Sequence, residues 1–183
     1  MLDRLKHWMG RDTPPAASRG PYEMQVLMVC MGNICRSPIA EGVLRAKLAQ
    51  AGLQRRVAVD SAGTHGYHTQ EPPDPRAIRL AARRGYEIAN QRARPVLPED
   101  FARFHWMLAM DEANLKWLLE RAPTEGAPRI ELLLSPLQDN PASREVPDPY
   151  YGPEAGFEQV LDLVERACDS WVLKLEARLD GKA

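Results

Sequence analysis

One short segment between an apolar run and a helical pattern constrains this chain more than any other feature. Residues Met24 to Val29 are apolar and β-rich, and the segment that follows reads Cys30-Met31-Gly32-Asn33-Ile34-Cys35-Arg36-Ser37. A loop of this length, ahead of a helix that begins near Pro38, lets backbone N–H groups and a helix N-terminus surround a tetrahedral anion. We therefore predict a strand, a phosphate-binding loop (residues 30–36) and a helix, with Cys30 held in the loop as a thiolate.

The rest of the chain alternates between β-rich runs and helical patterns, which is typical of a parallel α/β sheet. Strands are predicted at 24–29, 57–61, 105–109 and 130–134, and helices at 38–51, 75–84, 111–121 and 156–179, with a shorter turn near 98–101. We predict a single-domain α/β fold over residues 22–183, a three-layer sandwich around a central four-stranded parallel sheet. Residues 1–21 are predicted to be a flexible extension, or else a short amphipathic helix that docks on a partner.

Composition excludes several classes of protein. The 183 residues carry a net charge of -1 with both signs interspersed, so there is no electrostatic footprint for nucleic acid or an anionic membrane. Three cysteines are not the disulfide framework of a secreted domain. No apolar stretch reaches the roughly 20 residues of a spanning helix. We expect a cytoplasmic protein without membrane insertion, as a monomer or weak dimer.

The loop residues point to nucleophilic catalysis at phosphorus. Cys30 is the candidate nucleophile, and the planar fork of Arg36 suits two phosphoryl oxygens. Ser37 is positioned in the sequence to donate its hydroxyl to the Cys30 sulfur. Such a reaction also needs an acid for the leaving oxygen. Asp148, within Pro147-Asp148-Pro149-Tyr150-Tyr151-Gly152, is the best candidate, although a Pro-Asp-Pro segment is equally consistent with an ordinary turn.

Several separated segments resemble the low-molecular-weight protein tyrosine phosphatase family. The resemblance covers Val29-Cys30 through Ala40-Glu41, Asp60-Ser61-Ala62-Gly63-Thr64, Leu108-Ala109-Met110-Asp111 and Asp148-Pro149-Tyr150-Tyr151-Gly152. It implies hydrolysis of phosphotyrosine and aryl phosphates through a cysteinyl-phosphate intermediate, with no metal or other cofactor. It also implies phosphotyrosine-containing proteins as substrates.

The resemblance assigns roles to individual residues. It implies that Cys30 is the nucleophile, that Arg36 binds phosphate and that Asp148 is the general acid and then the base. Further roles are implied for a wider set: the phosphate-binding loop itself (Cys30, Met31, Gly32, Asn33, Ile34, Cys35, Arg36), support of that loop (Ser37, Ser61, Asp111) and the substrate cleft (Tyr67, Tyr150, Tyr151). Cys35 matches a second loop cysteine that forms a reversible disulfide with the nucleophile, the alternative being simple packing.

One position departs from the family, because Gln91 stands where a histidine is usual. We expect Gln91 to donate a hydrogen bond to Asp111, which also begins a helix. Cys168 falls on an apolar helical stripe and is predicted to be an inert buried thiol.

Three alternatives remain open within and beyond this family. Arsenate reductases of the same scaffold need further cysteines between Tyr67 and Pro95, and this chain has none there. Arginine phosphatases typically have threonine where Ile34 stands, which favours tyrosine phosphate as the substrate. A non-catalytic anion-binding module is disfavoured because nucleophile, arginine, serine and acid occur together.

Overall fold

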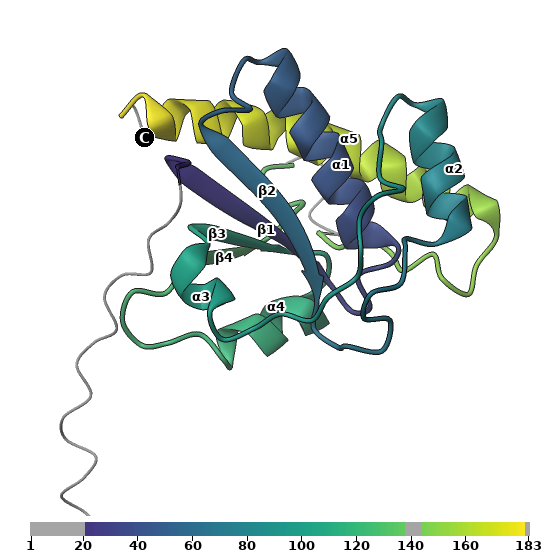
Figure 1. The fold of residues 1–183 in the computed structure, drawn as a ribbon, viewed down its shortest axis with the longest axis horizontal. Helices are drawn as coiled ribbons and strands as arrows, with labels where there is room; N and C mark the ends of the chain where they lie inside the picture. The colour runs from purple at the N-terminus through teal and green to yellow at the C-terminus, as the bar shows by residue number, and fades with distance from the viewer. Residues whose placement is uncertain (1–20, 138–143, 182–183) are drawn as a thin grey trace, which may run out of the picture.

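Four parallel strands form the centre of the molecule. The computed structural model describes residues 21–137 and 144–181, in which the strands are β1 (Met24–Cys30), β2 (Val57–Gly63), β3 (Trp106–Ala109) and β4 (Arg129–Leu132). Their order in the sheet is β2-β1-β3-β4, with β1 paired in parallel to both β2 and β3. The predicted four-stranded parallel sheet is confirmed (Figure 1).

Helices cover both faces of this sheet, so the predicted three-layer arrangement is also confirmed. Helices α1 (Arg36–Gln50) and α5 (Glu154–Leu179) pack against one face, with α2 (Pro75–Arg83) beside α5. Helices α3 (Asp100–Arg103) and α4 (Glu112–Leu119) lie on the other side (Figure 1). Each face has its own apolar core, because alternate residues of buried β1 point to opposite sides.

The sequence signals for helix ends act as expected. Asp74 accepts a hydrogen bond from the Arg76 backbone N–H at 2.8 Å, with Pro75 as the first helical residue of α2. Asp111 accepts one from the Asn114 N–H at 2.7 Å at the start of α4. Both aspartates accept hydrogen bonds from backbone N–H groups that the first turn of a helix leaves unpaired.

The predicted apolar stripe of α5 is buried along its whole length. It consists of Phe157, Val160, Leu161, Val164, Cys168, Trp171 and Leu175, none of which is exposed to solvent. Burial raises the pKa of the Cys168 thiol above its ordinary value, which agrees with an unreactive packing role. The stripe packs α5 against α1 and so supports the helix that follows the phosphate-binding loop.

Two elements are longer than predicted at the ends that lie next to the loop. Strand β2 continues to Gly63, which pairs with Cys30, and helix α1 begins at Arg36 rather than Pro38. Pro38 is tolerated there because the first turn of a helix does not use its own N–H groups. The loop is therefore held between a longer strand pairing and an earlier helix than the sequence indicated.

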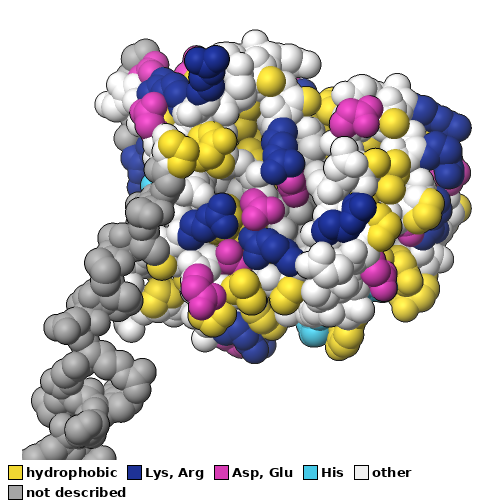
Figure 2. All heavy atoms as spheres, in the orientation of Figure 1, with side chains coloured by type: hydrophobic (Ala, Val, Ile, Leu, Met, Phe, Trp, Pro, Cys, Tyr) yellow, Lys and Arg dark blue, Asp and Glu magenta, His cyan; other side chains and the backbone are white. Residues whose placement is uncertain are grey.

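Surface properties follow the composition. On the face drawn in Figure 2, basic and acidic side chains lie interspersed rather than in blocks of one sign. Among residues 21–137 and 144–181, no helix combines the length and the apolar character needed to cross a membrane. The predicted N-terminal extension, apart from Pro21, falls outside the described residues.

Candidate active site

The phosphate-binding loop lies at the carboxyl end of β1, where the strands of a parallel α/β sheet commonly place their ligands. Backbone hydrogen bonds tie it to the segment after β2: Thr64 N–H donates to the Cys30 carbonyl at 2.8 Å and His65 N–H to the Met31 carbonyl at 3.0 Å. On its far side, Asp74 N–H donates to the Ile34 carbonyl at 2.8 Å. The loop is thus supported by neighbours distant in sequence.

Two donors converge on the Cys30 sulfur, which is only 2% exposed. The Ser37 hydroxyl lies 3.0 Å from Sγ, and the Asn33 backbone N–H donates to Sγ at 3.3 Å. Hydrogen bonds of this kind favour the charged form of an acceptor. The predicted contact between Ser37 and Cys30 is therefore present in the structure.

Asn33 has an unusual backbone conformation that its side chain stabilises. Its φ is +57°, a left-handed value that asparagine tolerates better than most residues. Its Nδ2 donates to the hydroxyls of Ser37 and Ser61, each at 2.9 Å, and its Oδ1 accepts from the Arg94 N–H at 2.9 Å. One amide group therefore joins the loop, α1, β2 and the segment before α3.

Arg36 is buried between two carboxylates, with 3% of its side chain exposed. Its Nη1 donates to Asp111 Oδ2 at 2.6 Å and to the Val146 carbonyl at 3.2 Å, and its Nη2 donates to Asp148 Oδ2 at 2.8 Å. Burial alone would lower the pKa of Arg36, but Cys30 and Asp148 outweigh it and raise the pKa overall. The guanidinium is therefore charged and oriented.

A cleft of about 220 Å³ brings the predicted residues together. Its lining comprises Cys30, Met31, Gly32, Ile34, Cys35, Arg36, Tyr67, His68, Asp148, Tyr150 and Tyr151. Asn33, Ser37, Ser61 and Asp111 stand behind this lining and contact it as described above. Residues separated by more than 100 positions thus meet in one concave site.

Aromatic side chains form the mouth of the cleft. Tyr67 stacks on His65 with ring centroids 5.2 Å apart, and Tyr150 meets Tyr151 edge-to-face at 4.8 Å. Tyr151 is 98% exposed, which leaves its ring available to a ligand. Gly32 also lines the cleft, and a Cβ there would lie 3.1 Å from the His68 ring, so any larger residue would have to displace that ring. These surfaces suit a flat group entering above the loop.

Sequence reasoning missed Arg76, which holds the segment around Asp148. Its guanidinium donates to the carbonyls of Tyr150 at 2.9 Å and Gly152 at 3.1 Å, while also pairing with Asp74 at 2.8 Å. Because Asp74 N–H bonds the Ile34 carbonyl, Arg76 connects the phosphate-binding loop to the Asp148 segment. The only signal in the sequence was its place after the Asp74-Pro75 helix start.

The expected contact between Gln91 and Asp111 was wrong. Gln91 Nε2 donates to the Pro38 carbonyl at 3.2 Å, and its Oε1 is buried without a hydrogen-bond partner. Asp111 instead accepts from Arg36 and from the Asn114 backbone. Both Asp111 oxygens thus have donors: Oδ2 accepts from the buried Arg36 guanidinium, a strong donor for a carboxylate, and Oδ1 accepts from the Asn114 N–H.

Cys35 is a free, buried thiol in the same loop as Cys30, five positions after it in the sequence. Burial, followed by the negative charge of Asp74, raises the pKa of Cys35 above its ordinary value.

Within the described residues, no group of three or more His, Cys, Asp or Glu side chains is arranged to hold a metal ion.

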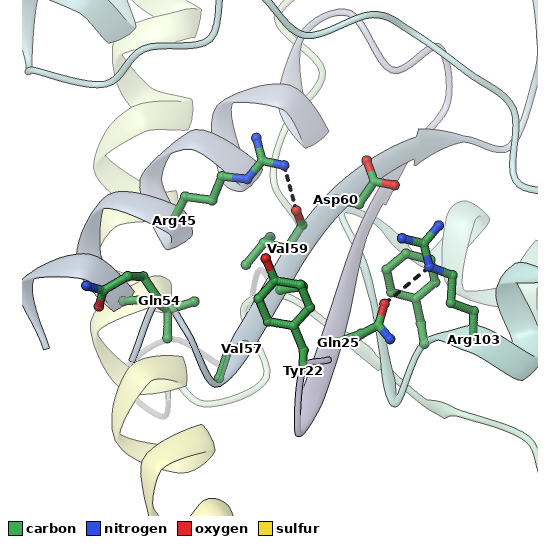
Figure 3. A pocket seen from close by; sticks show the side chains of 11 residues that line it. Tyr22, Gln25, Arg45, Gln54, Val57, Val59, Asp60 and Arg103 are labelled. Carbon is green, nitrogen blue, oxygen red and sulfur yellow. Dashed lines mark hydrogen bonds between the residues drawn. The ribbon is translucent and has the colours of Figure 1, made fainter. Parts of the chain in front are cut away.

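A larger hollow of about 520 Å³ lies along the edge strand β2, away from the loop (Figure 3). Arg45 and Arg103 lie on opposite sides of it, bonded to the Val59 carbonyl at 2.8 Å and the Gln25 side chain at 3.2 Å. No cysteine lines this hollow. The smaller cleft, which has a thiol, an arginine and a carboxylate, is therefore the candidate active site.

Comparison with known proteins agrees with this choice. Residues 25–181 match the family model of the low molecular weight phosphotyrosine protein phosphatases. A low molecular weight protein-tyrosine-phosphatase of Streptomyces coelicolor is 41% identical over 87% of this chain and 98% of its own length. A solved protein tyrosine phosphatase from Entamoeba histolytica superposes with a TM-score of 0.81 at 39% identity, covering 87% of this chain and 99% of that one.

One structural neighbour has a different named activity. The crystal structure of a Drosophila arginine phosphatase superposes with a TM-score of 0.78 at 30% identity, covering 83% of this chain and 98% of that one. The fold is thus shared by proteins named for phosphatase activity toward tyrosine and toward arginine.

The site and these likenesses define a cysteine-dependent phosphatase on a parallel α/β sheet. The chain belongs to the low molecular weight phosphotyrosine protein phosphatase family. The enzyme class expected from the sequence, a phosphomonoester hydrolase acting through a cysteinyl-phosphate, is that of the family and is confirmed.

Replacing Arg76 with alanine should loosen the segment around Asp148, because two carbonyls lose their donor. We expect faster amide hydrogen exchange between residues 146 and 152, with the central strands unchanged. The matched control is Arg79→Ala, which removes only an exposed ion pair to Glu154 from the same helix. Equal exchange in the two variants would contradict the assigned role of Arg76.

Proposed function

We propose that this protein hydrolyses phosphotyrosine in proteins, with Cys30 as nucleophile, Arg36 as phosphate ligand and Asp148 as general acid and base. The observation that carries the proposal is the meeting of these three groups in one aromatic-walled cleft. Each has the environment that its role requires: two donors on the thiol, a buried charged guanidinium and a partly exposed carboxyl group.

In the first step, Cys30 Sγ forms a bond to phosphorus while the bond from phosphorus to the phenolic oxygen breaks. Asp148 gives its proton to that oxygen, and tyrosine leaves. Arg36 currently donates to Asp148, which is 47% exposed and able to move. A phosphoryl group entering the loop competes for the same guanidinium nitrogen. This exchange releases the Asp148 carboxylate, which takes up a proton from solvent and approaches the leaving oxygen.

In the second step, the oxygen of a water molecule attacks phosphorus while the Asp148 carboxylate takes a proton from that water. The bond between sulfur and phosphorus breaks, and inorganic phosphate leaves. Ser37 stabilises the thiolate that departs, because its hydroxyl lies 3.0 Å from Sγ. Asp111 keeps Arg36 oriented throughout, since it binds the other guanidinium nitrogen. The loop is then ready for another substrate.

The cleft favours an aryl phosphate over a compact alkyl one. Met31 and Ile34 give it an apolar lining, and the tyrosine rings at its mouth can stack on a phenyl group. A guanidinium-linked phosphate would also reach the loop, but Ile34 offers it no hydrogen-bond acceptor or donor. Phosphotyrosine is accordingly the preferred substrate.

A redox role for Cys35 belongs to the same proposal. Peroxide converts the Cys30 thiolate to a sulfenic acid, and the Cys35 thiol then condenses with it, releasing water and forming a disulfide. Burial, followed by the negative charge of Asp74, raises the pKa of Cys35 and keeps it a thiol in the resting protein. A cytoplasmic location and a monomer or weak dimer complete the proposal; the reducing cytosol would return the disulfide to thiols.

Replacing Cys30 with serine should abolish hydrolysis of p-nitrophenyl phosphate while binding of inorganic phosphate survives. The hydroxyl is a poor nucleophile at neutral pH, whereas Arg36 and the loop amides remain. Turnover is measured by p-nitrophenol release, and phosphate binding by calorimetry. Equal turnover in the two proteins would remove Cys30 from the nucleophile role.

Substrate class is tested by comparing a phosphotyrosine peptide with the same peptide carrying phosphoarginine. We expect a higher kcat/KM for phosphotyrosine, and Ile34→Thr should move the ratio toward phosphoarginine. Phosphate release reports both reactions once spontaneous phosphoarginine hydrolysis is subtracted. A wild-type preference for phosphoarginine would overturn the substrate assignment but leave the roles of Cys30 and Arg36 intact.

Replacing Asp148 with asparagine should slow poor leaving groups more than good ones. Protonation contributes most where the leaving oxygen is basic, and a positioned acid is worth about 10²- to 10⁴-fold. A series of aryl phosphates with leaving groups of different pKa measures this dependence. A uniform loss across the series would show that Asp148 does not protonate the leaving group.

A further inference from the structure

A buried carboxyl group lies behind the phosphate-binding loop, outside the cleft. Glu41 is in the second turn of α1, and its side chain, 4% exposed, faces β2. Its Oε2 lies 2.5 Å from the Ser61 hydroxyl. No step of the proposed reaction uses Glu41, yet a buried acidic side chain is costly unless it is paired and hydrogen-bonded.

A continuous chain of hydrogen bonds joins this carboxyl group to the reactive sulfur. Ser61 Oγ accepts from Asn33 Nδ2 at 2.9 Å. The same amide nitrogen donates to Ser37 Oγ at 2.9 Å, and that hydroxyl lies 3.0 Å from Cys30 Sγ. Four hydrogen bonds therefore connect α1 and β2 to the nucleophile.

The hydrogen atoms available in this series of hydrogen bonds indicate which group donates at each step. Both hydrogens of the Asn33 amide are used, one on each serine oxygen. The Ser37 proton is then free to point at the sulfur, 3.0 Å away, which is closer than its other acceptor, the Ala62 carbonyl at 3.5 Å. The Ser61 proton points at Glu41. Only an acceptor at position 41 completes this pattern; a protonated carboxyl group can donate to Ser61 and leave its hydroxyl proton without a defined acceptor.

We propose that Glu41 is a positioning residue, whose carboxylate fixes, through Ser61 and Asn33, both hydrogen-bond donors on the reactive sulfur. One donor is the Ser37 hydroxyl, oriented by the Asn33 side chain. The other is the Asn33 backbone N–H, which reaches Sγ at 3.3 Å only while the left-handed conformation is maintained. Glu41 touches neither substrate nor sulfur and acts through these groups alone.

The surroundings of Glu41 place it close to a change of charge at neutral pH. Burial raises its pKa from an ordinary value of 4.5 to about 7, with Asp60 adding to the rise. Arg45, 2.5 Å away on the same helix, lowers the pKa, as do the Ser61 hydroxyl and Arg94. Arg45 also donates to the Val59 carbonyl, as Figure 3 shows, so it is held beside the carboxyl group.

A polar cavity of about 410 Å³ borders Glu41 on its open side. The further charged groups that line it are Glu87 and Arg92, which have opposite signs. Gln91 also lines the cavity, but its side-chain nitrogen donates to the Pro38 carbonyl rather than to the carboxyl group. Ser61 and Arg45 are therefore the partners that decide the orientation of Glu41.

The raised pKa of Glu41 makes the folded protein less stable as pH rises. Between pH 4.5 and about 7 the folded chain holds a proton on Glu41 that the unfolded chain has lost. Stability contributed by this group therefore decreases as pH rises through that window. A neutral side chain of the same shape avoids the loss, so position 41 would favour glutamine if stability alone mattered.

The test is Glu41→Met, which removes the acceptor at a similar side-chain length, with alkylation of Cys30 by iodoacetamide as its main measurement. Loss of ordered donors on the sulfur should move the midpoint of the alkylation pH profile upward by about one pH unit, with kcat for p-nitrophenyl phosphate falling by about 10-fold. At pH 8 the variant should melt at a higher temperature than the wild type, and at pH 5.5 at a similar one. A purely structural role predicts a lower melting temperature with less activity.

The direction of the alkylation shift decides the proposal. Removing a nearby anion by itself makes a thiolate easier to form, so a downward shift would show a simple charge effect and overturn the positioning role. An unchanged midpoint would overturn it as well. Glu87→Gln is the matched control: it removes the same charge from the same cavity, is exposed, and lies outside the hydrogen-bond chain, so its midpoint should stay at the wild-type value.

This inference rests on the proposed role of Cys30, but different experimental results would refute the inference and that role. Alkylation requires no turnover, so it reports the sulfur even if Cys30 were not the nucleophile toward phosphate. Catalysis that survives Cys30→Ser would refute the proposed function, whereas an unshifted alkylation profile in Glu41→Met would refute only the positioning role. Ser61→Ala breaks the same chain one bond later and should reproduce the upward shift.

Discussion

The side-chain amide of Asn33 is the contact on which the site depends. It bonds Ser37 and Ser61 through its nitrogen and the Arg94 backbone through its oxygen, while its own backbone keeps a left-handed φ of +57°. A left-handed asparagine is strained unless neighbouring groups determine it. Because those groups come from α1, β2 and the segment before α3, the loop can have its shape only when the sheet and its helices have assembled.

Arg36 shows a second consequence of this assembly. A guanidinium buried alone would be destabilising, but Asp111 accepts from one of its nitrogens and Asp148 from the other. The two carboxylates differ in their surroundings, since Asp111 also begins α4 whereas Asp148 lies in a more exposed segment tethered by Arg76. Together the two pairings hold the arginine in the lining of the cleft.

Local signals in the sequence account for most of the fold. The aspartates before α2 and α4 were recognisable because a helix N-terminus needs an acceptor there, and the stripe of α5 because its spacing matches the helical repeat. The expected bond from Gln91 to Asp111 failed for a non-local reason. Arg36 binds the same carboxylate, and no sequence pattern shows that a residue 75 positions away will contact Asp111 in the folded protein.

By itself, the sequence determined the chemical groups of the active site and the order of strands and helices that carries them. Cysteine, arginine and serine lie within one short segment, residues 30–37, so their chemistry could be inferred from spacing and from the helix that follows. The tertiary structure alone revealed two supporting contacts: Arg76 on the Asp148 segment, and Glu41 behind Ser61. The physical reason is that hydrogen-bond direction and burial depend on groups brought together only when distant segments pack, and short-range periodicity does not encode them.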